Sequence, residues 1–229
     1  MDHERTGSGP DLTPALGEVY AHRFTDREAR AKDAVWAVIV AHLQRFVVPG
    51  APVLDIACDR GYFIRHVEAA EKWATDVRDV SADLTTNVHF VQADGLALAR
   101  ILPAGHFGTA FMSNYLEHLP SPAAVMEQFA VVRELLRPGG RVVVLQPNIR
   151  LVGGAYWDFI DHKVALTDRS LVEAAESAGF RTYRLVVRFL PYTTKSRLPQ
   201  WPALVRVFLR LPPARWLLAG QTLYVGERR

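Results

Sequence analysis

The chain has 229 residues, and its composition, with 49% hydrophobic and 22% charged residues, is globular and excludes wholesale disorder. Its 27 basic and 24 acidic side chains give a formal net charge of +3, which is unevenly distributed. Residues 181–229 contain ten Lys or Arg and one acid, a charge of +9, so the first 180 residues carry −6. A basic end on an acidic body indicates an anionic partner for that end, or a solvated surface without a role.

Features that the sequence lacks limit where the protein can act. A single cysteine, Cys58, excludes an internal disulfide framework. The polar N-terminus has no apolar core of a signal peptide, and no apolar run reaches the roughly 18 residues of a membrane-spanning helix. The default expectation is a cytoplasmic protein.

Predicted helices and strands alternate along the chain. A polar segment, 1–14, precedes a helical pattern in which Val35, Ile39 and Leu43 recur at helical spacing until Pro49 and Gly50 end it. Short runs rich in apolar and β-branched residues predict strands at 53–57, 72–77, 88–93, 107–113, 141–146, 182–189 and 221–225. Further helices are predicted at about 62–71, 95–102, 122–136 and 170–178. This alternation predicts an α/β domain with a largely parallel sheet and helices on both of its faces.

The end of the first predicted strand is the place to seek a ligand site, because open α/β sheets bind ligands at the carboxyl ends of their strands. There the sequence reads Asp55-Ile56-Ala57-Cys58-Asp59-Arg60-Gly61. With Gly61 as its only glycine, this loop is not the dinucleotide fingerprint G-x-G-x-x-G, and it lacks the G-K-[ST] of a phosphate-binding P-loop. Nicotinamide and nucleotide triphosphate sites are therefore disfavoured.

Five segments in order resemble the motifs of class I S-adenosylmethionine (SAM) dependent methyltransferases. Residues 53–63 resemble the first motif, an acid followed by G-x-G-x-G, with Asp55 as the acid and Gly61 as the last glycine. Segments 73–77, 89–95, 111–119 and 135–141 resemble the ends of strands two, three and four and the turn into strand five. The resemblance implies a Rossmann-like fold with a seven-stranded, mostly parallel sheet, and SAM as the cofactor. It further implies a single domain over 1–229, with an N-terminal helical cap at 1–48 and an insertion at 191–220 before the last strand.

The candidate cofactor residues follow from the same resemblance. It implies that Asp76 accepts from the ribose hydroxyls and that Asp94 meets the adenine amino group, and both ligand groups are donors that suit a carboxylate. The small residues Ala57 and Gly61 let the backbone approach the cofactor. Two further candidates lie in an N-terminal segment that in this fold often closes over the cofactor. The full set is Tyr20, Arg23, Asp55, Ala57, Cys58, Asp59, Gly61, Asp76, Val77, Asp94, Gly95, Ser113 and Asn114.

Three departures from the family motif leave the strength of cofactor binding open. Ala57 occupies the first glycine of the loop, a mild change that adds one methyl group. Asp59 occupies the middle glycine of the loop, beside the methionine portion of the cofactor, where its Cβ would crowd and its carboxylate would repel the carboxylate of SAM. In strand four, Phe107 is followed by Gly108 where the family often has an acid. Ordinary divergence with an outward-pointing Asp59 explains these changes. The alternative explanation is that SAM binding is weakened, or that the fold is repurposed for a non-methylating reaction or as a binding module.

The acceptor side is expected in residues 147–200, whose sequence resembles a bacterial subgroup of these methyltransferases associated with saccharide and natural-product pathways. Aromatic residues next to acids and a histidine suit a polyol or a phenol. A hydroxyl acceptor also needs a base, and the catalytic candidates are His118, after strand four, and His162 with Asp161 beside it. A turn-orienting role for His118 stays open. The remaining histidines show no metal-ligand spacing, so no metal is expected. The candidates for binding the acceptor are Asn148, Tyr156, Trp157 and Tyr192.

The basic segment 197–219 combines Trp, Leu and Arg, with Arg206 and Arg210 on one helix face. It suits ordinary packing, peripheral membrane or lipid contact, a lid on the acceptor, or a homodimer contact. The basic residues are dispersed and accompany no nucleic-acid motif, so nucleic acid is not an expected partner. The sequence therefore predicts an enzyme, an O-methyltransferase that uses SAM to methylate a hydroxyl of a glycosylated or small natural-product acceptor.

Overall fold

The computed structural model describes residues 26–192 and 201–229, without the side chains of 26–29, 212 and 213. Its seven-stranded sheet has the strand order β3-β2-β1-β4-β5-β7-β6. Strands β1 to β5 pair in parallel, and β7 runs antiparallel to both β5 and β6. The predicted Rossmann-like, mostly parallel sheet is therefore confirmed. The strands are β1 (Val53–Ile56), β2 (Lys72–Asp76), β3 (Val88–Gln92), β4 (Phe107–Ser113), β5 (Leu136–Pro147), β6 (Phe180–Leu190) and β7 (Gln221–Arg228).

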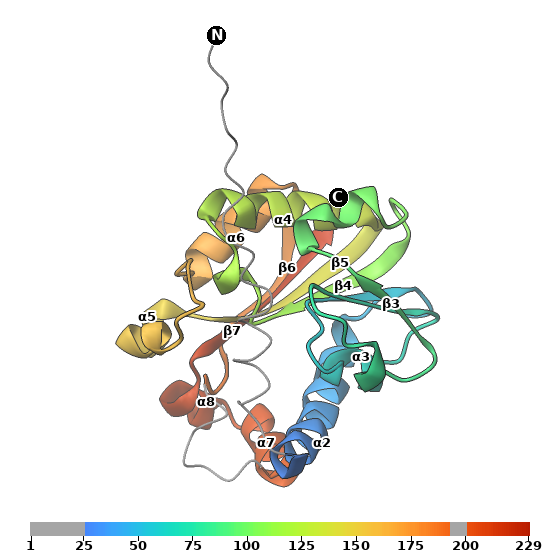
Figure 1. Cartoon of the computed structure of the whole chain (residues 1–229). Coiled ribbons are helices and arrows are strands. Elements are labelled where there is room, and N and C mark those ends of the chain that lie inside the picture. Colours follow the sequence, from blue (N-terminus) through green and yellow to red (C-terminus); the bar gives the residue numbers. More distant parts are fainter. Residues whose placement is uncertain (1–25, 193–200) are drawn as a thin grey trace.

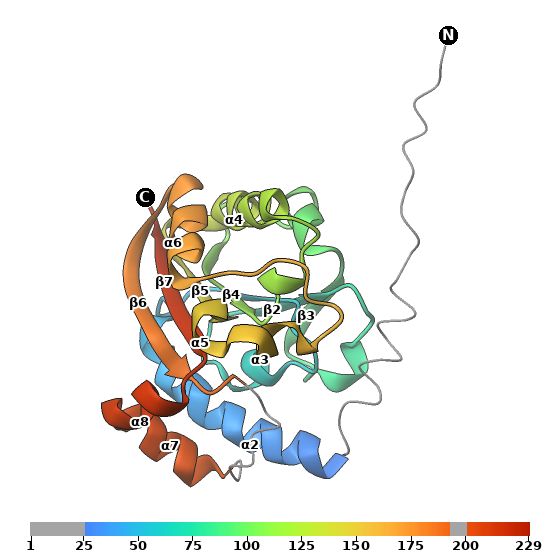
Figure 2. The same ribbon diagram turned by 90° about the vertical axis from the view of Figure 1, so that its left-hand side faces the viewer.

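Helices cover both faces of this sheet (Figures 1 and 2). One face carries α2, α3 and α7, and the other carries α4 and α6. Side-chain alternation along β4 produces the two cores, because Phe111 belongs to the core on the α2 side and Met112 to the core on the α4 side. The described α-helices are α2 (Asp26–Leu43), α3 (Tyr62–His66), α4 (Pro122–Leu135), α5 (Ile149–Val152), α6 (Asp168–Ser177), α7 (Pro202–Arg210) and α8 (Pro212–Leu218). The described 3-10 helices are η1 (Gln44–Phe46), η2 (Ser81–Asp83), η3 (Gly95–Arg100), η4 (Leu116–His118) and η5 (Gly153–Asp158).

Two predicted helices differ from the structure in length or in type. The helix predicted at 62–71 is the short α3, because the side chain of Gln44 takes both backbone groups of Glu68, accepting from its N–H at 2.9 Å and donating to its C=O at 3.0 Å. The helix predicted at 95–102 is the 3-10 helix η3, whose first turn is capped by Asp94, which accepts from Leu96 N at 2.8 Å. The Gln44 contact is one that local periodicity does not report, and the cap at Asp94 explains where η3 begins but not its 3-10 form.

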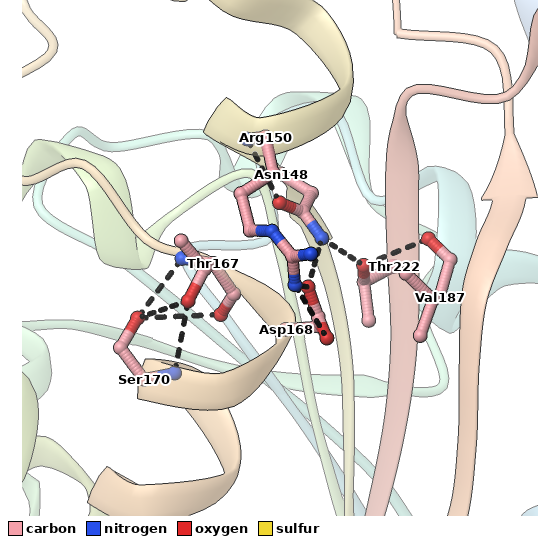
Figure 3. Close-up of polar contacts among 7 residues, drawn as sticks. All are labelled: Asn148, Arg150, Thr167, Asp168, Ser170, Val187 and Thr222. Carbon is pink, nitrogen blue, oxygen red and sulfur yellow. Dashed lines mark hydrogen bonds and ion pairs between the residues drawn. The ribbon is translucent and has the colours of Figure 1, made fainter.

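Helix α6 begins earlier than predicted because a capping box fixes its first turn. Thr167 Oγ1 accepts from Ser170 N at 3.0 Å, and Ser170 Oγ accepts from Thr167 N at 2.9 Å (Figure 3). The helix therefore starts at Asp168 instead of at Ser170.

The predicted insertion forms two short helices, α7 and α8, between β6 and β7. Leu211 ends one helix and begins the next, and Pro212 stands at the first position of α8. Helix α7 contacts α2, so the insertion lies beside the N-terminal helix (Figure 2). Among the described residues no helix has the length and apolar character needed to cross a membrane. The division into one domain with a cap at 1–48 remains a prediction.

Candidate active site

The loop between β1 and α3 keeps the backbone of a glycine motif without its glycines. Ala57, Asp59 and Gly61 have positive φ angles of 56°, 51° and 70°. These are the three alternate positions of G-x-G-x-G, and a left-handed backbone costs a side-chain-bearing residue about 1–2 kcal/mol. At Gly61 space also requires glycine, because an added Cβ would lie 2.3 Å from Leu84 Cδ2. The loop thus has the shape that the sequence motif predicts.

Asp55 at the end of β1 is a buried carboxylate with one unsatisfied oxygen. Its Oδ2 has no hydrogen-bond partner in the part of the chain that the structure describes. Burial raises the pKa of Asp55 well above its usual value, the backbone N–H of Ile64 opposes this, and the charges of Asp76 and Asp59 add to it. A cationic ligand group beside this loop would offset the free-energy cost of burying the Asp55 charge and the repulsion from the neighbouring carboxylates.

Asp76, the predicted ribose partner at the end of β2, lies in a cluster of charges. Its Oδ1 accepts from Arg78 N and Nε, both at 3.0 Å, and its Oδ2 accepts from Asp59 N at 3.1 Å and Arg78 Nη2 at 3.2 Å. Arg78 Nη2 also lies 3.1 Å from Asp59 Oδ1, and Lys32 Nζ lies 3.6 Å from Asp59 Oδ2. Burial opposes the charge on Arg78, but the two carboxylates outweigh it and raise its pKa. The carboxylate of Asp59 is thus held by Arg78 and Lys32, and its outward orientation remains a prediction.

The other residues of the first and second strand ends have distinct surroundings. Cys58 is buried, its backbone N–H donates to Thr75 O at 2.9 Å, and burial raises the pKa of its thiol, which therefore stays protonated. Val77 follows Asp76 and is 44% exposed, an apolar surface suited to the face of a base. Tyr20 and Arg23 lie outside the described residues.

Candidates from strands three and four lie along the same edge of the sheet. The exposed Asp94 uses one oxygen to cap η3, which leaves its other oxygen for a donor such as an amino group. A Cβ on Gly95 would lie 2.2 Å from Tyr115 Oη, so this glycine gives room to the neighbouring side chain. Asn114 has φ 47° and accepts from Gln221 Nε2 at 2.8 Å, and Ser113 Oγ accepts from Asn114 Nδ2 at 3.3 Å.

The turn after β4 carries a second cluster, made of Glu117, His118 and His162. Two backbone N–H groups, of Lys163 at 2.8 Å and Val164 at 3.0 Å, donate to Glu117 O and hold the loop after η5 against η4. This contact places His118 Nε2 4.0 Å and His162 Nε2 3.9 Å from Glu117 Oε1. The two imidazole rings meet edge to face, with centroids 5.0 Å apart. The structure thus brings both predicted catalytic histidines to one carboxylate.

Backbone carbonyls fix the orientation of both rings. Asp161 O lies 3.1 Å from His118 Nδ1, and Tyr156 O lies 2.6 Å from His162 Nδ1. A carbonyl only accepts, so each Nδ1 carries the proton and each Nε2 is turned toward Glu117. The Asp161 carboxylate lies 3.5 Å from His118 Nδ1, so this predicted residue is brought to His118.

Glu117 was not among the predicted site residues, although it precedes His118 directly. It is 1% exposed, and its Oε2 accepts from Gln146 Nε2 at 3.0 Å. Burial raises the pKa of Glu117, and the neighbouring His118 opposes this rise. An acid next to a candidate catalytic histidine, four residues after the end of β4, is the sequence signal that could have identified it.

The predicted acceptor-binding residues Tyr156, Trp157 and Tyr192 differ in burial and in hydrogen bonding. Tyr156 is fully buried and donates to Val164 O at 2.6 Å, whereas Trp157 is half exposed. Tyr192 Oη is buried without a hydrogen-bond partner among the described residues, and burial followed by the charge of Glu117 raises the pKa of Tyr192 to about 12. The hydroxyl of Tyr192 is therefore a free donor on the side of the cluster.

Asn148 has contacts that explain a structural role (Figure 3). It caps α5 by accepting from Arg150 N at 3.0 Å, and its amide donates to Asp168 Oδ1 at 2.9 Å and Thr222 Oγ1 at 3.1 Å. Both amide N–H bonds are used inside the protein, and the side chain is buried. Its contacts give no support to the predicted role in acceptor binding.

Comparison with known proteins decides the family. A model of a family described as a methyltransferase domain matches residues 25–185, more than half of the chain. The chain belongs to this methyltransferase family. Together with the strand order, the match makes it a class I SAM-dependent methyltransferase, as the loop motif predicted. No curated protein sequence matches the methyltransferase.

Solved structures share the fold of this methyltransferase at low sequence identity. A SAM-dependent methyltransferase from Archaeoglobus fulgidus is 18% identical, with a TM-score of 0.61 over 84% of this chain and 94% of that chain. A geranyl diphosphate methyltransferase in complex with GPP and sinefungin is 14% identical, with a TM-score of 0.59 over 83% and 77%. The [4+2]-cyclase SpnF is 18% identical, with a TM-score of 0.58 over 95% and 92%.

SAM is the cofactor of this methyltransferase, and the strand-end residues fit it. The unsatisfied, buried Asp55 Oδ2 among other acids suits the positive charges of the methionyl ammonium and the sulfonium. When bound, SAM supplies an electrophilic methyl group. The family resemblance assigns its nucleoside to the region of Asp76, Val77 and Asp94, which remains a prediction.

Proposed function

We propose that this methyltransferase methylates a hydroxyl group of a small polyhydroxylated or phenolic acceptor, such as a glycosylated natural product. The observation that carries the proposal is the convergence of Glu117 Oε1 with the Nε2 atoms of His118 and His162. This cluster follows β4, the strand next to β1 and its cofactor loop. A hydroxyl is a poor nucleophile until its proton is removed or its charge is stabilised, and the cluster provides groups for that task.

The reaction is an in-line displacement. A bond forms between the acceptor oxygen and the methyl carbon, while the carbon–sulfur bond breaks and its electron pair returns to sulfur, giving S-adenosylhomocysteine. The hydroxyl proton is released, so the cationic sulfonium is exchanged for one proton. Lone pairs on His118 Nε2 and His162 Nε2 can receive that proton directly, and together with Glu117 they can also hold a cation that acidifies the hydroxyl.

Aromatic and hydroxyl groups beside the cluster support an acceptor with rings and hydroxyls. Trp157 offers an exposed ring face, and Tyr192 offers a buried hydroxyl without a partner among the described residues. Such a combination binds a sugar or a phenol by stacking and by hydrogen bonds.

The test is methyl transfer from SAM to a panel of sugars, glycosides and phenols, followed by the mass of the product and the formation of S-adenosylhomocysteine. We expect His118→Gln and His162→Gln to lower kcat by about 10²–10⁴-fold. The matched control is His106→Gln, which removes a histidine from a surface pair with Glu71. Transfer to nitrogen or carbon acceptors alone, or both histidine variants reacting as fast as the original chain, would contradict the proposal.

A second candidate is a methyltransferase fold that binds a ligand without methylating it, as the Asp59 substitution in the sequence already suggested. The observation that favours it is Arg78, which donates to both oxygens of the carboxylate assigned to the ribose. Calorimetry with SAM and S-adenosylhomocysteine separates the two candidates. Binding of neither ligand, or binding without turnover on any hydroxylated acceptor, would favour the second.

The surface of α7 and α8 supports a third element of the proposal, an acceptor met at an anionic lipid surface. Trp216 and Leu217 are 72% and 85% exposed, and Trp201 and Leu211 add further exposed apolar area. The segment 201–219 contains three arginines and no acid. Exposed Trp and Leu with cations are typical of a helix that lies in a membrane interface. Contact with a second copy of the chain is the alternative occupant of this surface.

A further inference from the structure

The arrangement of Glu117, His118 and His162 raises a question of charge. Glu117 is buried, and no Lys or Arg among the described residues lies within ion-pair distance of its carboxylate. The groups that face its Oε1 are two imidazole nitrogens, each turned inward because the other nitrogen of its ring is bound to a backbone carbonyl. Three electron-pair donors therefore point at one another, with the carboxylate buried and His118 partly exposed. A buried carboxylate requires a positive partner or a proton, and a cation at this point would satisfy all three donors.

We propose that Glu117, His118 and His162 bind one divalent metal ion of the Zn²⁺ class. Two histidines and one carboxylate are the ligand set of catalytic zinc sites, which keep a further position open for water or substrate. Imidazole and carboxylate together also suit other borderline ions such as Co²⁺. The proposed ligand atoms, one from each residue, all lie within 4.8 Å of one another.

The distances and the surroundings of the rings fit such a site. Ligand atoms around a tetrahedral zinc are about 3.3–3.5 Å apart, so the separations of 3.9 and 4.0 Å need to shorten by about half an ångström. A metal-binding imidazole normally donates its other N–H to a carbonyl or a carboxylate, which fixes its tautomer. His118 has Asp161 O and Oδ2 at that nitrogen, and His162 has Tyr156 O.

Packing holds the second imidazole in place. Phe159 stacks on the ring of His162 with centroids 5.1 Å apart, and Tyr156 meets it edge to face at 4.9 Å. Gln146 donates to the far oxygen of Glu117 and leaves Oε1 for the cluster. All three ligands are therefore oriented by contacts already present in the protein.

Spacing along the chain predicted no metal, and we replace that expectation with this proposal. The ligands come from η4 and from the loop after η5, which are distant in sequence. They meet because Lys163 and Val164 donate to Glu117 O. A bound cation would lower the pKa of a hydroxyl that coordinates it, and the released proton would pass to water. This catalytic role of the ion rests on the proposed function. The binding of the ion does not depend on that function.

The test uses the untagged full chain, stripped with a chelator and titrated with Co²⁺ under visible absorption and with Zn²⁺ by calorimetry. We expect one ion per chain and visible bands typical of Co²⁺ with fewer than six ligands. His118→Ala, His162→Ala and the isosteric Glu117→Gln should each weaken binding by about a hundredfold or more. The surface variant His106→Ala, from the pair with Glu71, should bind as the original chain does.

The outcomes separate the metal site from the proposed function. No Co²⁺ or Zn²⁺ binding by the original chain, or undiminished binding by all three folded variants, overturns the site. Circular dichroism of each variant identifies one that fails to fold, and the remaining variants then decide. Metal binding as expected together with methyl transfer that a chelator leaves unchanged overturns the role of the ion. Metal binding without any hydroxyl methylation contradicts the proposed function and leaves the site intact.

Discussion

Arg78 holds Asp76 at two points, with Nε donating to Oδ1 at 3.0 Å and Nη2 donating to Oδ2 at 3.2 Å. The family resemblance assigns these same oxygens to the ribose hydroxyls of SAM, so the guanidinium and the cofactor compete for one carboxylate. The contact also neutralises Asp76, which is almost fully buried.

Removal of the Arg78 guanidinium should lower the stability of the fold without weakening cofactor binding. We expect Arg78→Ala to lower the free energy of unfolding by about 1–3 kcal/mol, because Asp76 loses charged donors. SAM should bind at least as tightly, since its hydroxyls replace those donors. Urea unfolding and calorimetry measure the two effects, with the exposed Arg100→Ala as control. A tenfold loss of SAM affinity would instead make Arg78 a cofactor contact.

Asp59→Gly tests whether the carboxylate in the glycine loop harms cofactor binding. The residue has φ 51° and its side chain is held by Arg78 and Lys32, so we expect SAM affinity to be kept or improved. The loss of two ion pairs should lower the free energy of unfolding by about 0–1 kcal/mol each. A glycine tolerates the left-handed backbone better and should raise it by a similar amount, so we expect little net change. Ala57→Gly, with φ 56° and no ion pair to lose, should stabilise the fold by about 0.5–1 kcal/mol. A large loss of affinity in calorimetry would show that Asp59 contacts the ligand.

His42 should make the fold sensitive to acid. Burial, followed by the charges of Arg45 and Arg215, lowers the pKa of His42 from 6.5 to about 4. Between these values the unfolded chain binds a proton that the folded protein does not, so stability decreases as the pH falls through this window. After allowance for partial exposure, we expect a loss of about 1–2 kcal/mol. Urea unfolding at pH 7 and pH 4.5 should show a smaller loss for His42→Gln, and the exposed His89→Gln should behave as the original chain does.

The surface of α7 and α8 should bind anionic vesicles. We expect sedimentation with phosphatidylserine vesicles, weakened by salt because arginine charges contribute. Trp216→Glu and Leu217→Glu should abolish binding, whereas Met126→Glu, which changes an exposed apolar residue on α4, should not. If binding is absent and the same variants instead dissociate a dimer in light scattering, the surface is a contact between two copies.

The strand ends that carry the candidate cofactor residues could be predicted from sequence because the strand pattern is local. Asp55 lies near the end of β1, Asp76 ends β2 and Asp94 follows β3, and parallel strands bring their carboxyl ends to one edge. The contact of Arg78 with Asp76 depends on a side-chain conformation two residues beyond the strand, which no periodicity reports. The short α3 likewise depends on Gln44, a side chain from a different element.

The acceptor half could be predicted only in part because its residues meet through tertiary contacts. The sequence pointed to His118 and His162 separately, and neighbouring residues suggested Asp161 as a partner of His162. The backbone contacts of Glu117 with the loop after η5 bring all of them together, and those contacts have no sequence signature. Asn148 was predicted to bind the acceptor because it is a polar residue that follows a strand. In the structure its side chain instead caps helix α5.

Because Lys163 and Val164 both donate to Glu117 O, the loop that carries His162 and the turn that carries His118 are tethered at one carbonyl. We expect an acceptor that pushes this loop aside also to misalign Glu117. The fit of the acceptor then decides how well the reacting groups are aligned. Hydroxyl compounds that fit badly should therefore show a larger decrease in kcat than increase in KM in steady-state kinetics.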